Sequence, residues 1–147
     1  NAIGTSAASA ASNPVTPVFP IAIGSTHQGG VVFYILQDGD TGYVEGETHG
    51  LIAAVQDQSN GIQWGGSYST TEATGTAIGT GSANTTTIIT EQGAPELFYA
   101  AGLARAYEGG GHADWFLETD ECLKHNLTNH THIPRLKIEA RITFDFK

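Results

Sequence analysis

The clearest periodic pattern of the chain lies at its C-terminus, where apolar and polar residues alternate over residues 136–147. Every second position is apolar, from Leu136 to Phe146, and the positions between them are polar or charged. Strict alternation places apolar side chains on one face of a strand and polar side chains on the other. The pattern therefore predicts a final β-strand with one buried face and one solvated face.

Two short apolar runs predict further strands. Residues 31–36 form a run of β-branched and aromatic residues that follows Gly29-Gly30 and precedes a turn over residues 38–42. Residues 51–55 form a second run, which ends at a polar loop over residues 56–61. Apolar runs of this length bounded by glycine and aspartate are typical of buried strands.

Two helices are predicted between these strands and the C-terminal strand. The first runs from about residue 84 or 85 to Gln92, with Gly93 as its stop signal. The second starts with Pro95 in its first turn and ends before the glycine triplet at residues 109–111. One face of the second helix is expected to lie in the core, because four of its residues recur at helical spacing: Tyr99, Leu103, Ala106 and Tyr107. Thr119 is a suitable N-cap for a third, short helix over residues 120–125.

Residues 1–20 differ from the rest of the chain. They are rich in Ala and Ser up to Ser12 and rich in Pro from Pro14 to Pro20. One or two turns of helix followed by an extended connector are too short to be stable alone. We therefore expect an N-terminal arm, residues 1–20, that packs against copies of itself as part of a stalk. The binding domain is expected to span residues 21–147.

Composition supports a loop-rich domain of the α+β class. The chain has 147 residues, of which 39% are hydrophobic, 14% are charged and 19 are Gly, a profile that suits short strands and loops better than a helical bundle. No run approaches the ~18 apolar residues of a membrane span, so no direct membrane insertion is expected. The single Cys122 cannot form an internal disulfide, and a small buried residue is its simplest role.

The net charge of −9 conceals a strong asymmetry along the chain. Residues 1–123 contain thirteen carboxylates and one cation, Arg105, whereas residues 124–147 contain five cations and two carboxylates. The C-terminal segment also contains three of the six histidines. Asymmetry of this kind indicates where an anionic partner would bind in an otherwise acidic protein.

The chain has no recognisable enzyme signature. It contains no nucleophile elbow, no phosphate-binding glycine loop, no zinc-protease motif and no paired cysteines. Scattered acidic residues such as Asp114, Glu118 and Glu121 do not form a recognisable catalytic pair. We therefore expect a binding protein rather than an enzyme.

A metal site is a weaker alternative at the turn that follows the first strand. Asp38 and Asp40, followed by Glu45 and Glu47, place four carboxylates within ten residues, but their spacing does not match a calcium-binding loop of the EF-hand type. A solvated hairpin turn is the preferred interpretation, and a weak Ca²⁺ or Mg²⁺ site is the alternative. Apart from that weak cation, no cofactor is expected.

The two tryptophans have two possible roles. Trp64 and Trp115 each follow or lie within an apolar stretch, so a place in the core is the preferred interpretation. The alternative is that they are exposed platforms on which sugar rings stack.

The basic residues of the C-terminal segment are the principal candidates for ligand binding. Lys137, Arg141 and Lys147 occupy the polar side of the predicted strand, and alternate residues there lie roughly 6.6–7 Å apart, a spacing comparable to that of charges on a sulfated polysaccharide. The predicted glycan-binding set is Lys124, His132, Arg135, Lys137, Arg141 and Lys147. The alternative is an ordinary solvated face on which Glu139 and Asp145 neutralise the cations.

Four motifs in order resemble a family of bacterial surface domains. They are Ile23-Gly24-Ser25-Thr26-His27-Gln28-Gly29-Gly30, Gly50-Leu51-Ile52-Ala53-Ala54 with Gly61-Ile62-Gln63-Trp64-Gly65, Thr74-Gly75-Thr76-Ala77-Ile78-Gly79-Thr80-Gly81, and Asp114-Trp115-Phe116-Leu117. The family includes the Fibrobacter major paralogous domains and the C-terminal domains of Legionella collagen-like proteins. The match covers about residues 21–123, and beyond it the compact basic ending most resembles the collagen-like members.

The resemblance implies a small C-type-lectin-like domain with an antiparallel sheet and two or three short helices. It also implies an extracellular location on a bacterial cell surface, a homotrimer beneath a collagen-like stalk, and binding of sulfated glycosaminoglycans. It supplies no catalytic residues and implies no nucleic-acid partner. Together with the charge pattern, it predicts an adhesin that binds anionic carbohydrate. A structural trimerisation cap and a divalent-cation-dependent lectin are the alternatives.

Overall fold

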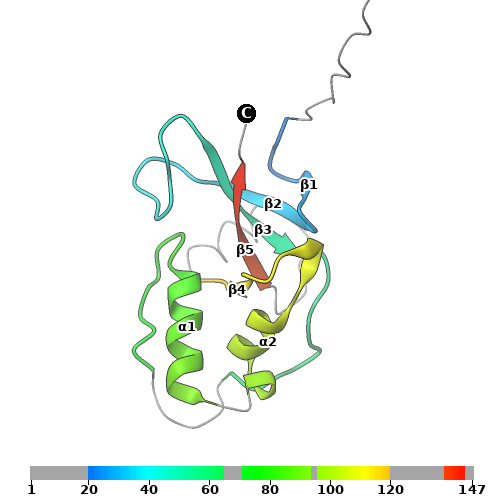
Figure 1. Ribbon diagram of the computed structural model, residues 1–147, viewed down its shortest axis with the longest axis vertical. Coiled ribbons are helices and arrows are strands. Elements are labelled where there is room, and N and C mark those ends of the chain that lie inside the picture. Colours follow the sequence, from blue (N-terminus) through cyan, green and yellow to red (C-terminus); the bar gives the residue numbers. More distant parts are fainter. Residues whose placement is uncertain (1–19, 65–70, 94–95, 120–137, 145–147) are drawn as a thin grey trace, which may run out of the picture.

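The computed structural model describes residues 20–64, 71–93, 96–119 and 138–144, the last of these by its backbone. Three predictions fall outside these residues: the N-terminal arm, the short helix over residues 120–125 and the buried position of Cys122. The described residues form a mixed α and β domain with an antiparallel sheet and two α-helices (Figure 1). This agrees with the predicted fold class.

The sheet has five strands, and the last strand of the chain lies inside it. The strands are β1 (Thr26–His27), β2 (Gly30–Ile35), β3 (Thr48–Ala54), β4 (Phe116–Leu117) and β5 (Ile138–Phe144). Their order is β1-β2-β3-β5-β4, and every neighbouring pair is antiparallel. The three predicted strands are thus confirmed, although β3 begins at Thr48 rather than at Leu51.

The helices lie at the end of the sheet where β4 is found (Figure 1). Helix α1 (Gly81–Gln92) confirms the first predicted helix, begins three residues or more before the predicted start, and ends at Gly93 with a φ of 69°. The second predicted helix is divided. A single 3₁₀ turn, η1 (Glu96–Phe98), precedes α2 (Ala100–Ala106), and a further 3₁₀ turn, η2 (Gly109–Gly111), follows it.

The prediction of one continuous second helix is therefore wrong, and Tyr99 explains why. Tyr99 adopts an extended conformation with φ −140° and ψ 162°, and its side chain is fully buried. Its hydroxyl donates to the carbonyl of Gly93 at 2.9 Å. A buried aromatic ring with a satisfied hydroxyl outweighs the helical preference of the surrounding residues.

The predicted buried face of the second helix is also wrong in part. Tyr99 is buried and Leu103 is half-buried, but Ala106 is exposed. The residues that α2 buries are small: Ala100, Ala101, Gly102 and Ala104. Small residues allow the helix backbone to approach the sheet closely, so the core face of α2 follows the alanines rather than the larger side chains.

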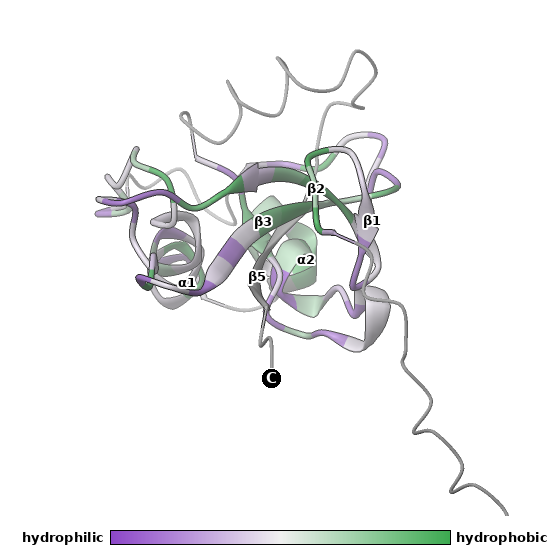
Figure 2. Ribbon diagram, turned by 90° about the horizontal axis from the view of Figure 1, so that it is seen from above, coloured by the Kyte–Doolittle hydropathy of each residue, from purple (hydrophilic) through white to green (hydrophobic). Residues whose placement is uncertain are grey.

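The sheet buries apolar residues on both of its faces. Val32, Ile52 and Ala54 pack with Ile88 of α1 and with the buried residues of α2, forming the cluster on the helix side. Phe33, Leu51 and Ala53 pack with Leu36, Ile78 and Phe116, forming a second cluster. Figure 2 shows the resulting concentration of hydrophobic residues in β2 and β3. Strand β3 contributes to both clusters, and all of its residues after Thr48 are buried.

Helix α1 is attached to β4 at its first turn. A Cβ atom on Gly81 would lie 2.6 Å from the carbonyl oxygen of Leu117 and 2.7 Å from the ring of Phe116, so only glycine fits there. One turn later, the hydroxyl of the fully buried Thr85 donates to the carbonyl of Gly81 at 2.8 Å and accepts the backbone N–H of Leu117 at 3.0 Å. Thr85 thereby joins the helix to the sheet through a buried hydrogen bond.

Replacement of Thr85 by valine should destabilise the domain by about 1–3 kcal/mol, because the buried N–H of Leu117 loses its acceptor while the side-chain volume is kept. Urea unfolding of the variant measures the change. Thr90→Val is the matched control, because Thr90 lies on the same helix but is exposed and bonds only to its own helix in the described contacts. Equal stabilities of the two variants would contradict this account of the helix–sheet junction.

Candidate functional site

The predicted glycan-binding strand is confirmed as a strand over the residues that the structure describes. Its register is continuous with β3, from Thr48 opposite Phe144 to Ala53 opposite Glu139. Arg141 lies opposite Leu51, and Glu139 lies between Ala53 on one side and Phe116 on the other. These β3 and β4 neighbours are buried. The strand is therefore paired on both sides at Glu139, with β4 alone at Ile138 and with β3 alone over residues 140–144.

Arg141 is the one predicted glycan-binding residue that lies within the described residues, where its backbone occupies the middle of β5. The other members of the set lie outside them: Lys124, His132, Arg135, Lys137 and Lys147. Arg135 and Lys137 precede the first residue of β5, and Lys147 follows the last. The assignment of this set to a glycan site stays a prediction.

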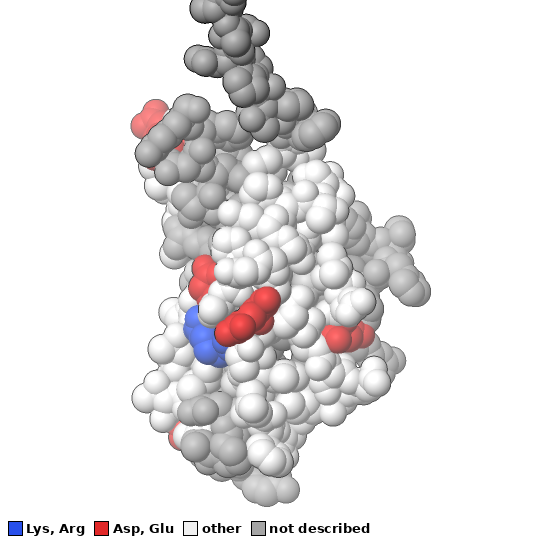
Figure 3. Space-filling model, turned by 45° about the vertical axis from the view of Figure 1, so that its right-hand side comes forward, with Lys and Arg blue, Asp and Glu red and all other residues white. Residues whose placement is uncertain are grey.

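Arg105, the single cation of residues 1–123, is bound to helix α1. Its guanidinium donates to the hydroxyl of Thr86 at 3.0 Å and to the carbonyl of Ser82 at 3.3 Å. It thus ties the last turn of α2 to the first half of α1. Figure 3 shows a face of the molecule on which acidic groups outnumber basic ones. The acidic part of the chain, residues 1–123 (the acidic body), therefore has its one cation in contacts within the domain.

The turn that contains Asp38 and Asp40 is confirmed as a turn, and Asp40 stabilises it. One carboxylate oxygen of Asp40 accepts the backbone N–H of Gln37 at 2.8 Å and the hydroxyl of Tyr34 at 2.9 Å. Asp38 is exposed beside it. The described residues contain no group of three or more His, Cys, Asp or Glu that could hold a metal ion. The weak cation site at Asp38 and Asp40 stays a prediction, and these hydrogen bonds supply a structural role for Asp40.

The start of β3 contains a histidine–carboxylate pair that sequence reasoning did not find. The Nε2 atom of His49 lies 2.6 Å from a carboxylate oxygen of Glu47, and the His49 side chain is 7% exposed whereas that of Glu47 is 48% exposed. A carboxylate accepts, so Nε2 donates this hydrogen bond. Nδ1 is buried and has no hydrogen-bond partner within the described part of the chain. No spacing signal in the sequence distinguishes this pair from a solvated strand end.

The two tryptophans have opposite environments. Trp115 is fully buried, its indole N–H donates to the carbonyl of Gly109 at 3.2 Å, and its ring meets that of Tyr107 edge to face at 4.9 Å. The predicted core position of Trp115 is confirmed. The predicted core position of Trp64 is wrong, because Trp64 is 63% exposed. Trp64 lies in the loop after β3, directly after Gln63, whose backbone pairs with that of Tyr99.

Comparisons with protein-family models, with curated proteins and with solved structures give no match to this chain. The family resemblance of its motifs therefore stays a prediction. Among the helices that the structure describes, none is long and apolar enough to cross a membrane.

A second histidine pair lies where the β1–β2 turn meets the η2 turn. Gly110 packs directly on the backbone of Gln28 and Gly29 and adopts a φ of 63°, so the two turns touch without intervening side chains. His27 and His112 flank this contact. Burial lowers the pKa of His27 below its ordinary value of 6.5, and the charge of His112 lowers it further. The fold therefore favours neutral His27.

Stability should fall as the pH drops below about 6.5, because the unfolded chain then takes up a proton at position 27 more readily than the folded chain does. The contribution of neutral His27 is complete above pH 6.5 and is lost as the pH falls through the lowered folded pKa. Melting temperatures at pH 7.5 and 5.5 should differ less in His27→Gln than in the unmodified protein. An identical decrease in both proteins would show that this histidine does not couple folding to pH.

Proposed function

We propose that this chain is a non-enzymatic adhesion domain of a bacterial cell surface that binds sulfated glycosaminoglycans through its basic C-terminal segment. The observation that carries the proposal is the distribution of cations. Five of the six Lys and Arg residues lie in residues 124–147, and the sixth, Arg105, is bound to α1. An anionic polysaccharide therefore finds its basic partners in the C-terminal segment.

The position of β5 supports this proposal because it fixes the backbone of Arg141 within the sheet. A ligand that binds residues on or beside a strand held between β3 and β4 does not have to order a flexible tail, which lowers the entropic cost of binding. The attraction is between largely solvated charges, so it depends on salt. The electrostatic screening length shortens from ~10 Å at 0.1 M salt to ~3 Å at 1 M salt.

Arg141 is the cation of this segment whose backbone position is described, and it lies inside β5 opposite the buried Leu51. His132 would add positive charge to the same segment below its unperturbed pKa of about 6.5. Acidification should therefore strengthen binding while salt weakens it.

Neutralisation of the segment should release the protein from heparin. The double variant Lys137→Gln with Arg141→Gln loses two cations per chain. Immobilised heparin should therefore release it at a lower salt concentration than the unmodified protein, and at 0.15 M salt it should not be retained. Chromatography on heparin with a salt gradient measures the effect. Melting temperatures identify any loss of folding, which is relevant for Arg141 because it lies inside the sheet.

Asn60→Glu with Ala106→Glu is the matched control. It lowers the net charge by the same amount, but at exposed positions of the acidic body. This control should keep its retention on heparin. Unchanged retention of the Lys137 and Arg141 variant would contradict the proposal, and loss of retention on addition of a chelator would favour a divalent-cation-dependent lectin instead.

We further propose that the domain is a lectin-like homotrimer whose arms, residues 1–20, associate. The described fold agrees with this to the extent that it is a small antiparallel sheet with two helices. The arm is rich in Ala and Ser, and side chains of that size allow close packing of several chains. Three copies of the basic segment would give a weak charged surface the avidity that adhesion needs.

Light scattering on the purified protein should give a mass about three times the 15.4 kDa of one chain. Removal of residues 1–20 should shift the mass towards that of a single chain, because the arm is proposed to hold the copies together. A mass of one chain for the complete protein at micromolar concentration would contradict the trimer and would remove the avidity argument. Loss of heparin binding with the trimer intact would favour the structural trimerisation cap.

A further inference from the structure

Three large apolar side chains are exposed on two neighbouring segments near the helices. Trp64 is 63% exposed, Leu97 is 59% exposed and Phe98 is 67% exposed. Isolated exposed apolar residues are common on protein surfaces, but a group that includes two aromatic residues is unusual. The group is not explained by the core, because both apolar clusters of the described residues exclude all three.

The backbone pairing beside Trp64 and Phe98 limits the distance between them. Gln63 pairs with Tyr99 in a parallel bridge, and the N–H of Ala100 donates to the carbonyl of Gln63 at 3.0 Å. Trp64 and Phe98 are the direct neighbours of these two paired residues. Adjacent Cα atoms are 3.8 Å apart and paired strands are about 4.8 Å apart, so the Cα atoms of Trp64 and Phe98 are at most about 12 Å apart.

The support beneath these residues is rigid. Tyr99 is fully buried, and its hydroxyl is bonded to the carbonyl of Gly93. Ala100 and Ala101, which follow it, are also buried. Exposed aromatic residues on a fixed backbone are already oriented for a ligand, which lowers the entropic cost of binding.

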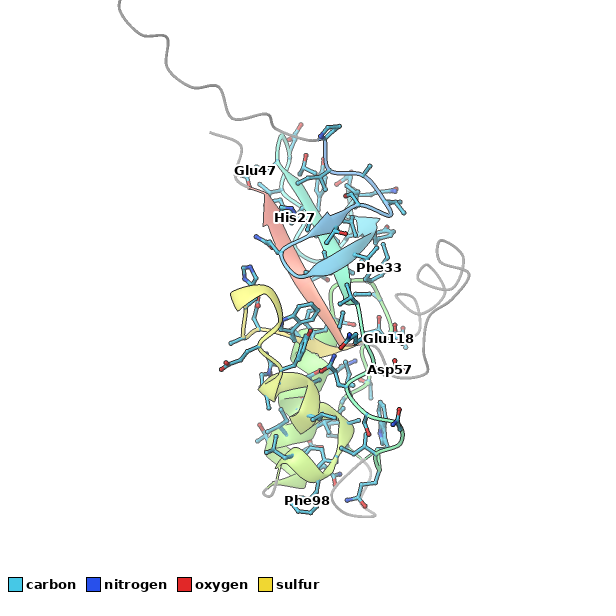
Figure 4. The ribbon with its side chains drawn as sticks, turned by 90° about the vertical axis from the view of Figure 1, so that its right-hand side faces the viewer. His27, Phe33, Glu47, Asp57, Phe98 and Glu118 are labelled. Atoms are coloured by element: carbon cyan, nitrogen blue, oxygen red, sulfur yellow. The ribbon has the colours of Figure 1, made fainter. Side chains whose placement is uncertain are left out.

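Phe98 lies at the end of the domain opposite Glu47. In Figure 4, Phe98 is at one end of the molecule and Glu47 is at the other, with the sheet between them. Strand β1 lies in the half of the molecule away from the helices (Figure 1). Phe98 therefore lies at the helical end of the described domain.

The exposed area is too small for a stable protein partner. An aromatic side chain offers roughly 150–250 Å² of surface, so the exposed fractions of these three side chains amount to roughly 300–400 Å². A stable protein interface buries about 800 Å² on each partner. The area is instead suited to one or two flat rings of a small ligand.

The charges near the group favour a neutral ligand that carries hydroxyl groups. Residues 56–64 and 96–100 contain Asp57 and Glu96 and no Lys or Arg, so they offer nothing to a sulfate or carboxylate. Gln63 and Asn60 are exposed amides that can donate to and accept from hydroxyl groups. The C–H face of a neutral hexose packs on an aromatic ring, while its hydroxyls meet such amides.

We infer that Trp64 and Phe98 form a stacking platform for a neutral oligosaccharide, separate from the basic C-terminal segment. The platform accounts for the exposure of both aromatic residues, the backbone pairing between their segments and the absence of cations beside them in the sequence. It does not rest on binding of sulfated glycans, because it uses different residues and a ligand of different charge.

A panel of neutral hexasaccharides tests the platform: cellohexaose, maltohexaose, mannohexaose and chitohexaose. At least one should bind saturably by calorimetry and shift the tryptophan emission, since Trp115 is buried and Trp64 is the exposed reporter. Trp64→Ala should abolish binding, and Phe98→Ala should weaken it by about tenfold while it keeps the reporter. Val55→Ala is the matched control, because Val55 is 53% exposed and lies outside the platform.

Three results would overturn the platform. They are no binding of any of the four sugars by the unmodified protein, undiminished binding by Trp64→Ala, and a self-association that sedimentation shows to depend on Trp64 and Phe98. Melting temperatures of both variants should stay within about one degree of the unmodified value, because the replaced side chains are mostly exposed. Heparin retention should be unchanged in Trp64→Ala, so a failure of the platform and a failure of the glycosaminoglycan proposal give different results.

Discussion

The insertion of the last strand between β3 and β4 is the contact on which the rest of the structure depends. Strand β3 is buried on both faces and pairs with β2 on one side and with β5 on the other. Strand β4, which α1 contacts through Thr85, joins the sheet through β5. Without the C-terminal strand, β3 would be an unpaired edge, and β4 with its helix would lose its partner in the sheet.

This arrangement ties together two parts of the chain with opposite charge. The acidic body contains one cation, Arg105, which joins α2 to α1 through a hydrogen bond to Thr86. The described part of the basic segment, Ile138–Phe144, joins the body through backbone pairing with β3 and β4. Attraction between opposite charges does not select one conformation of the segment, whereas the pairing of β5 with β3 fixes the register of residues 138–144. Arg141, a member of the proposed ligand site, thus lies in the strand that completes the sheet.

The strands could be predicted because their patterns are local. Strict alternation over the last residues identified β5, and short apolar runs identified β2 and β3 with errors only at their ends. The position of β5 inside the sheet could not be predicted, because alternation gives the faces of a strand and not its neighbours. The pairing of Leu51 with Arg141 depends on the order of the strands in the sheet, which no local sequence pattern indicates.

The errors in the helical region have a tertiary origin. Helical spacing grouped Tyr99 with the residues of α2, but burial of its ring and its bond to Gly93 require an extended backbone there. The sequence places Trp64 in the core because it follows an apolar stretch, but in the fold it lies beside the bridge between Gln63 and Tyr99 and is 63% exposed. The fold brings His27 near His112, and it buries His49 beside Glu47. Neither pair has a sequence signature.

Amide chemical shifts of isotope-labelled protein, titrated with a sulfated heparin hexasaccharide, test the central claim most directly. The account predicts perturbations at the amides of β5, Ile138–Phe144, and at those of the adjoining basic residues, with saturation that weakens as salt is raised. Perturbations confined to the acidic turn around Asp38 and Asp40, with β5 unaffected, would contradict it.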